Sequence, residues 1–141
     1  MTLHNEDKGS FRTKNAANGR SSDTCASVNP GICGFTCWIK AWKINQKTVG
    51  LEISESECQQ IRQLSSLLSQ LTLKEVFRPM TSNPAYIAAE QSGCHPSCPV
   101  PAAVIKAAEV AMEMALASDT FVRFEPCKRK LEKKLDKFTM E

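Results

Sequence analysis

Residues 94–98, Cys-His-Pro-Ser-Cys, place two thiols and an imidazole within five positions, just before a proline-rich helix start. Thiolates bind zinc and iron, and they also attack electrophiles, so this turn is the strongest candidate for chemistry in the chain. Cys33 and Cys37 repeat its gap of three residues. Structural zinc sites use gaps of roughly two to four residues between paired cysteines. The spacing allows a metal site, and it equally allows small residues that fit a tight turn.

The cysteine count and the N-terminus bear on this choice. Seven cysteines in 141 residues are many, and the number is odd. The N-terminal segment has no apolar stretch of the kind that a secretory signal needs, so we expect a cytoplasmic protein. Disulfide frameworks are rare in a reducing compartment, where clustered cysteines more often bind metal or take part in catalysis. The net charge of +3 does not indicate nucleic acid, and no apolar run is long enough to span a membrane.

Composition divides the chain into three parts. Residues 1–30 are polar and rich in Ser, Asn, Gly and Lys, which predicts a disordered N-terminal tail. Residues 31–125 have the apolar periodicity of a folded, cysteine-bearing domain. Residues 126–141 contain a run of Lys and Arg, which predicts a basic C-terminal helix or tail.

Alternating apolar residues predict a β-hairpin from strands over 34–43 and 48–54. If the odd-numbered residues of both strands face the core, the loop centre lies near Gln46. Residues whose numbers sum to about 92 then lie opposite one another. Trp38 and Trp42 would lie on the other face of the hairpin, either covered by the C-terminal segment or available to a partner.

Two helix starts can be read from local sequence after the hairpin. Ser54 and Glu57 have the spacing of a capping box, and a stripe of Ile and Leu follows them. Asn83 and Pro84 predict the cap and the first turn of a short helix that covers 85–91. In both cases the residues that predict the helix start lie within one turn of the helix itself.

The last third of the domain predicts one more helix and one more strand. Pro101 suits the first position of a mostly apolar helix over 101–117, and residues 120–125 alternate as a strand does. The element order is then β-β-α-α-α-β. The expected fold class is α+β, with a small antiparallel sheet and helices packed on one face.

The hairpin register brings two cysteines of different segments together. It places Cys33 at the same end of the domain as Cys58, which lies in the first turns of its helix. Cys98 precedes another helix, and a helix N-terminus lowers the pKa of a thiol. Cys33, Cys58, Cys94 and Cys98 would supply the four thiolates that zinc or an iron–sulfur cluster needs, with His95 as an alternative ligand. The sequence does not decide between the two centres.

Two other functions stay open. A non-catalytic interaction module would keep its cysteines for structure, with Cys37 and Cys58 in the core, and would dock a protein partner through Trp38, Trp42 and the basic tail. A thiol-redox protein would instead use Cys98 or Cys58 as its reactive group. No phosphate loop, nucleophile elbow or zinc-protease motif is present, so no enzyme class is predicted. Nucleic acid is not an expected partner, and the oligomeric state is undefined.

Three strings carry a resemblance to a known family: Cys-Gly-Phe at 33–35, Ser-Glu-Cys-Gln-Gln-Ile at 56–61, and Cys-His-Pro-Ser-Cys-Pro-Val-Pro with its Ala-rich helix at 94–111. In this order they are similar to an uncharacterised small-domain family of anaerobic prokaryotes, known mainly by its cysteines. The likeness spans residues 32–125. It implies that Cys33, Cys58, Cys94 and Cys98 belong together, with His95 as a further member. It leaves out Cys25, Cys37 and Cys127, and it implies no activity.

Overall fold

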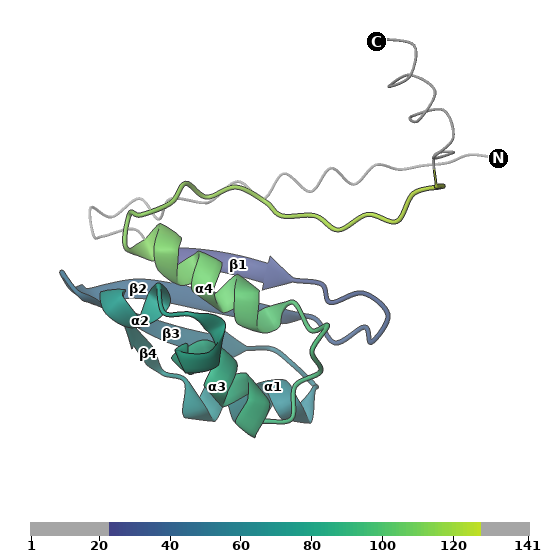
Figure 1. The fold of residues 1–141 in the computed structure, drawn as a ribbon, viewed down its shortest axis with the longest axis horizontal. Coiled ribbons are helices and arrows are strands. Elements are labelled where there is room, and N and C mark those ends of the chain that lie inside the picture. The colour runs from purple at the N-terminus through teal and green to yellow at the C-terminus, as the bar shows by residue number, and fades with distance from the viewer. Residues whose placement is uncertain (1–22, 128–141) are drawn as a thin grey trace, which may run out of the picture.

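The computed structural model describes residues 23–127, which form a four-stranded sheet and a set of short helices (Figure 1). In chain order the elements are β1 (Thr24–Val28), β2 (Cys37–Asn45), β3 (Thr48–Ser54), α1 (Gln59–Leu67), β4 (Gln70–Thr72), α2 (Leu73–Val76), a 3₁₀ turn η1 (Met80–Ser82), α3 (Pro84–Gln91) and α4 (Val100–Ala111). The strands lie in the order β1-β2-β3-β4, and every neighbouring pair is antiparallel.

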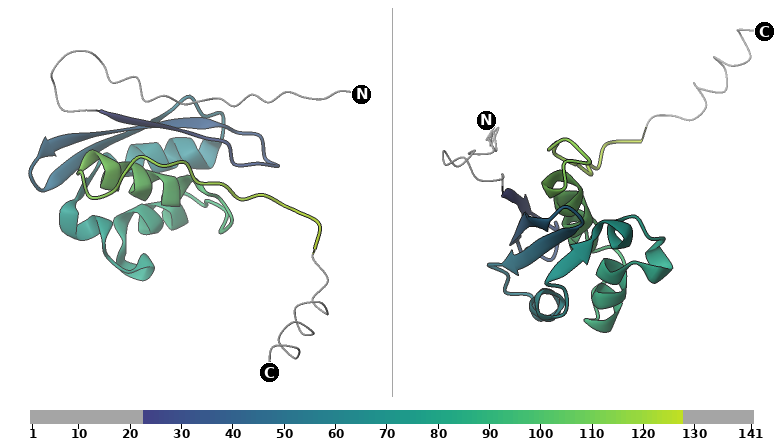
Figure 2. Two further views of the ribbon diagram at one scale, coloured as in Figure 1. Left: turned by 90° about the horizontal axis from the view of Figure 1, so that it is seen from above. Right: turned by 90° about the vertical axis from the view of Figure 1, so that its left-hand side faces the viewer.

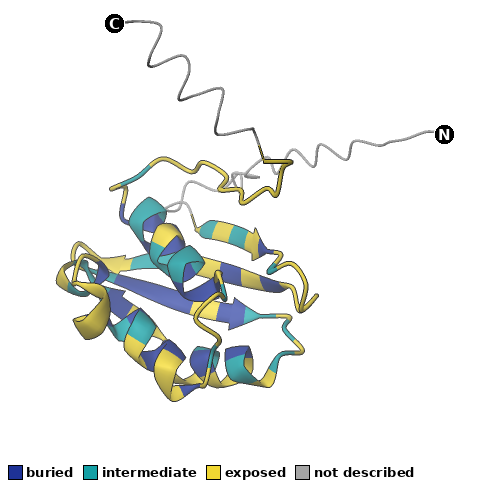
Figure 3. Cartoon of the chain, turned by 45° about the vertical axis from the view of Figure 1, so that its right-hand side comes forward, coloured by how far each residue is buried: buried dark blue, intermediate teal, exposed yellow. Residues whose placement is uncertain are grey.

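The helices form a second layer on one face of the sheet (Figure 2). Helix α4 packs across β1, β2 and β3, α1 packs against β3, and α3 contacts both α1 and α4. Every second residue of the two central strands is buried beneath them: Cys37, Ile39, Ala41, Val49, Leu51 and Ile53. Figure 3 shows this alternation of buried and exposed positions along the strands. The predicted α+β class, with helices on one face of a small antiparallel sheet, is confirmed.

The β2–β3 hairpin has the predicted register. Ile39 lies opposite Ile53 and Ala41 opposite Leu51, so the paired numbers sum to 92. The turn is closed by Asn45, whose Oδ1 accepts a hydrogen bond of 2.9 Å from the backbone N–H of Lys47. Because one face of each strand is buried, a slip of one residue would turn the apolar set toward solvent, and this fixes the register.

The other face of the sheet carries the two tryptophans. The Trp42 ring lies over Gly50, and a Cβ at Gly50 would come within 2.6 Å of Trp42 Cζ2. Only glycine leaves room for the ring at this position, so the Trp42 ring packs on the sheet of its own chain. Lys40 Nζ is 5.9 Å from the centre of that ring. Trp38 is 40% exposed.

The prediction of a disordered tail through residue 30 is wrong for residues 24–28, which form β1. Only Val28 in this strand is fully buried, and Ala26 packs partly against the core. An edge strand needs few apolar residues, because one edge and one face of it meet solvent. The polar composition of residues 24–28 therefore gave no sign of a strand. Residues 1–22 of the predicted tail lie outside the described residues.

The helix after β3 begins later than predicted. Ser54 is the last residue of β3, and Cys58 is the N-cap of α1, without a side-chain capping bond. A capping box exists instead at α2, where Thr72 Oγ1 accepts from the Glu75 N–H at 3.2 Å and Glu75 Oε1 accepts from the Thr72 N–H at 3.0 Å. The Ser54 prediction was wrong because the strand continued through that residue to pair with Trp38.

Helix α4 is shorter than the predicted span 101–117. It ends at Ala111, and Glu113 adopts the left-handed conformation with φ 61°. The Met114 N–H then donates to the Glu109 carbonyl at 2.9 Å, as in a Schellman-type helix end. No helix among the described residues is long and apolar enough to cross a membrane.

The predicted strand over 120–125 does not form within the described chain. Residues 116–127 are all exposed and have no strand partner there. Alternation makes a segment suitable for a sheet, but a strand also needs a neighbouring edge with which to pair. Most of the predicted basic tail 126–141 lies outside the described residues, which end at Cys127.

Candidate functional site

Five cysteines from four separate segments lie at one end of the fold: Cys33, Cys37, Cys58, Cys94 and Cys98. We call them the thiol cluster. The sheet register brings the end of β1, the start of β2 and the end of β3 together, since Val28 pairs with Cys37 and Trp38 with Ser54. The α3–α4 connection reaches this same end of the sheet (Figure 1).

Cys33 lies in the exposed β1–β2 connection, between two glycines in the left-handed region. Gly31 has φ 91° and Gly34 has φ 72°. The Gly31 N–H donates to Asn29 Oδ1 at 3.1 Å, and the Gly34 N–H donates to the Gly31 carbonyl at 2.9 Å. Residues with a Cβ rarely adopt these angles, so the glycines are what lets the chain turn on both sides of Cys33.

Cys58 is held at the N-terminus of α1. Its N–H donates to Ser56 Oγ at 3.2 Å, and its thiol donates to Gln60 Oε1 at 3.2 Å. Arg62 Nε donates to the Ser56 carbonyl at 2.8 Å, which ties the residues before the helix to its first turn. The half-buried Cys58 side chain packs against the hydrophobic core.

Cys94 follows directly from the end of α3. Gly93 adopts φ 73°, and the Cys94 N–H donates to the Ala89 carbonyl at 2.9 Å. This is a Schellman-type end, in which glycine at the left-handed position reverses the chain. It sets the Cys94 backbone against the last turn of α3. The half-buried Cys94 side chain packs against the core.

Cys98 closes a tight turn and lies beside a helix start. Its N–H donates to the His95 carbonyl at 3.0 Å. The backbone N–H of Val100, the first residue of α4, donates to the Cys98 sulfur. The His95 side chain is exposed, and its carbonyl is the group that shapes the turn.

Burial and neighbouring thiols raise the pKa of three cysteines in the thiol cluster, Cys37, Cys94 and Cys98. Burial raises the pKa of Cys37 to about 11, and negative charge on Cys98 and Cys58 adds to the rise. Burial and then Cys98 and Cys58 also raise the pKa of Cys94.

Cys98 corrects one expectation. Burial raises its pKa most, the Val100 N–H opposes that rise, and negative charge on Cys58 and Cys33 adds to it, so the net shift is upward. The predicted lowering by the helix N-terminus is present as a hydrogen bond, but desolvation and neighbouring thiolates outweigh it. Burial therefore favours the protonated form of Cys98.

The described side chains form neither a disulfide nor a group of metal ligands. None of the seven cysteines, all of which are described, is in a disulfide. Within residues 23–127, no three or more His, Cys, Asp or Glu side chains are grouped as metal ligands would be. Cys25 and Cys127 are exposed, and neither acts on the pKa of Cys37, Cys94 or Cys98.

Cys37 is the member of the cluster that sequence analysis assigned to the core alone. It is buried, as expected for a core residue, and negative charge on Cys98 and Cys58 also raises its pKa. The available signal was the repeated gap, three residues from Cys33 to Cys37 and three from Cys94 to Cys98. That gap links Cys37 to Cys33, whereas the strand pattern accounts only for the burial of Cys37.

These features define a small, two-layer α+β domain with cysteines gathered at one end of its sheet. The chain belongs to DUF6951, a family of unknown function, which matches residues 24–124. The match begins at the first residue of β1 and includes the whole thiol cluster. No curated protein and no solved structure matches the chain.

The metal-free, reduced protein should lose stability as the pH rises above about 9. The pKa of Cys37 moves from 9.0 to about 11 on folding, so the folded chain keeps a proton that the unfolded chain releases. The stabilisation is complete below pH 9 and is lost on the way to pH 11. For Cys37 it amounts to about 2–3 kcal/mol. Urea unfolding from about pH 8 to 10.5 measures it, with Cys37→Ala as the comparison. Equal pH dependence in the two proteins would contradict the prediction.

Proposed function

We propose that this protein binds a zinc ion or an iron–sulfur cluster through Cys33, Cys58, Cys94 and Cys98. The observation that supports the proposal is the strand register, which brings the ends of β1 and β3 and the start of β2 together, at the end of the sheet that the α3–α4 connection also reaches. Neighbouring thiolates repel, so the arrangement becomes favourable once a cation replaces their protons. His95, in the same turn, is a further ligand or an outer partner of one.

Of the two centres we favour the iron–sulfur cluster, because the resemblance to a family of anaerobes suits a centre that oxygen would damage. Zinc and a cluster would each use four thiolates, and the same four cysteines would supply them. When bound, a cluster would supply one-electron chemistry, so the proposed role is electron transfer or a redox accessory.

A protein partner is proposed to dock at the Cys33 connection. Ile32 is fully exposed beside Cys33, and Phe35, two residues further along, is 41% exposed. Apolar side chains beside an exposed ligand offer a contact surface for a redox partner. A cytoplasmic, reducing compartment would keep the thiols free, and the resemblance to a family of anaerobes suits an oxygen-sensitive centre. The thiol-redox alternative is less favoured for Cys98, because burial and neighbouring thiols raise its pKa and so disfavour the reactive thiolate.

Anaerobic purification with metal and sulfide analysis tests the proposal. We expect a brown protein with iron and acid-labile sulfide, whose visible absorption bleaches on reduction. A colourless protein with one zinc per chain would keep the metal site and change its occupant. Absence of metal after both anaerobic and aerobic purification, with failed reconstitution, would contradict metal binding and leave the interaction module as the better account.

A further inference from the structure

The chain after α4 is an exposed apolar segment. Residues 116–127, here called the C-terminal arm, are exposed throughout, including Leu116 (91%), Phe121 (75%), Val122 (87%) and Phe124 (96%). The arm leaves the end of α4 and extends past both layers without joining either one (Figures 1 and 2). Apolar side chains exposed together in this way mark an interaction surface.

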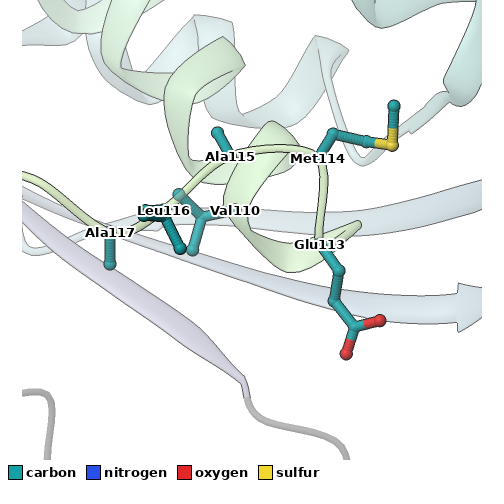
Figure 4. Close-up of a pocket in the computed structure, with 6 residues that line it drawn as sticks. All are labelled: Val110, Glu113, Met114, Ala115, Leu116 and Ala117. Atoms are coloured by element: carbon teal, nitrogen blue, oxygen red, sulfur yellow. The ribbon is translucent and has the colours of Figure 1, made fainter.

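The base of the arm forms only a shallow pocket, lined by Val110, Glu113, Met114, Ala115, Leu116 and Ala117 (Figure 4). Glu113 is the only ionisable residue in this lining, so the pocket itself offers little chemistry. The informative part of the arm lies further on. Residues 120–125 have the alternation of a strand, and Pro126, which lacks an N–H, is suited to ending one.

The sheet has an edge that such a strand could join. The order β1-β2-β3-β4 leaves one side of β1 without a strand partner among residues 23–127. Helix α4 packs over β1, so an added strand would have the helix beside its inner face. The opposite edge is less suitable, because β4 has only three residues and β1 has five.

We propose that the C-terminal arm of one chain pairs with β1 of a second copy, forming a two-fold dimer with exchanged arms. Among its described residues, each chain has a strand-like segment and a sheet edge that are both without a strand partner. In a two-fold dimer each arm would pair with β1 of the other chain, so both segments and both edges would be covered. The arm points away from the sheet of its own chain, which favours a second copy as the occupant.

Strand geometry assigns the apolar side chains of the arm to its two faces. Side chains alternate between the faces of a strand, so Val122 and Phe124 share one face and Phe121 lies on the other. Paired with β1, one face of the arm would lie beside α4, and its exposed apolar side chains would be removed from solvent. The proposal is independent of metal binding.

Light scattering of the full chain in reductant tests the oligomeric state, and we expect the mass of a dimer at about 100 µM. The double variant Phe121→Asp/Phe124→Asp should halve that mass and leave the circular dichroism spectrum unchanged. Phe77→Asp is the matched control, because Phe77 is 56% exposed and lies outside the arm. This variant should remain a dimer.

Amide exchange locates the contact. In the dimer, all N–H groups of β1 should exchange slowly, and those on its outer side should become fast in the double variant. A monomeric wild-type chain would overturn the proposal, as would a dimer that survives the double substitution. Loss of the dimer in Phe77→Asp, or β1 exchange that is equal in dimer and double variant, would also overturn it.

Discussion

Replacing Cys98 by alanine should weaken metal binding more than 100-fold, since even the residues that only support a ligand contribute about 10–100-fold. The Cys98 N–H donates to the His95 carbonyl and the Val100 N–H donates to the Cys98 sulfur, so the backbone holds this thiol at the start of α4. Cys37 is the one member of the thiol cluster outside the proposed ligand set that could replace it. The loss should appear as absent visible absorption after anaerobic reconstitution with iron and sulfide.

Two matched variants complete this experiment. Cys25→Ala removes an exposed cysteine on β1, and it should bind metal as the wild type does. Cys37→Ala tests whether Cys37 is a ligand or only a neighbour of the site. If this variant still binds metal, the ligands are among the other four thiols, and if it does not, Cys37 is also a ligand. Unchanged binding in Cys98→Ala would contradict the proposed site, whichever metal is used.

Replacing Asn83 by aspartate should lower the free energy of unfolding by about 3–5 kcal/mol, the range typical of an uncompensated buried charge. Asn83 is 2% exposed, and its Nδ2 donates to the carbonyls of Glu75, Val76 and Arg78 at 3.1–3.2 Å. Its Oδ1 accepts from the Ala85 N–H at 3.0 Å. Aspartate has the same shape but no donor, so a carboxylate oxygen would face three carbonyl oxygens.

Urea unfolding at neutral pH measures this effect, and Asn45→Asp is its matched control. Asn45 is exposed and its side chain also accepts a bond from a backbone N–H two residues ahead, so the same chemical change should cost only about 0.5 kcal/mol there. Similar losses at the two positions would contradict the role assigned to Asn83. Because Asn83 holds the start of α3, the variant also tests how firmly the helix before Cys94 is anchored.

Local sequence determined the hairpin and the start of α3. The alternation of β2 and β3, with one face buried, is enough to define their register, because a shift by one residue reverses every side chain. Asn83 and Pro84 specify a helix start through their own conformations and one hydrogen bond to Ala85. In both cases the deciding interactions join residues that are near in sequence. The four-cysteine site stays a prediction.

Tertiary structure decided what depends on distant partners. β1 is a strand because β2 offers it an edge and α4 covers it, which the polar sequence of residues 24–28 does not reveal. Residues 120–125 alternate equally well and form no strand within the described chain, since no edge is paired with them. The pKa of Cys98 rises although a helix begins beside it, because burial and the charge on Cys58 and Cys33 come from elsewhere in the fold. Strand pairing and desolvation are properties of the surroundings that folding assembles, so a segment's own residues do not define them.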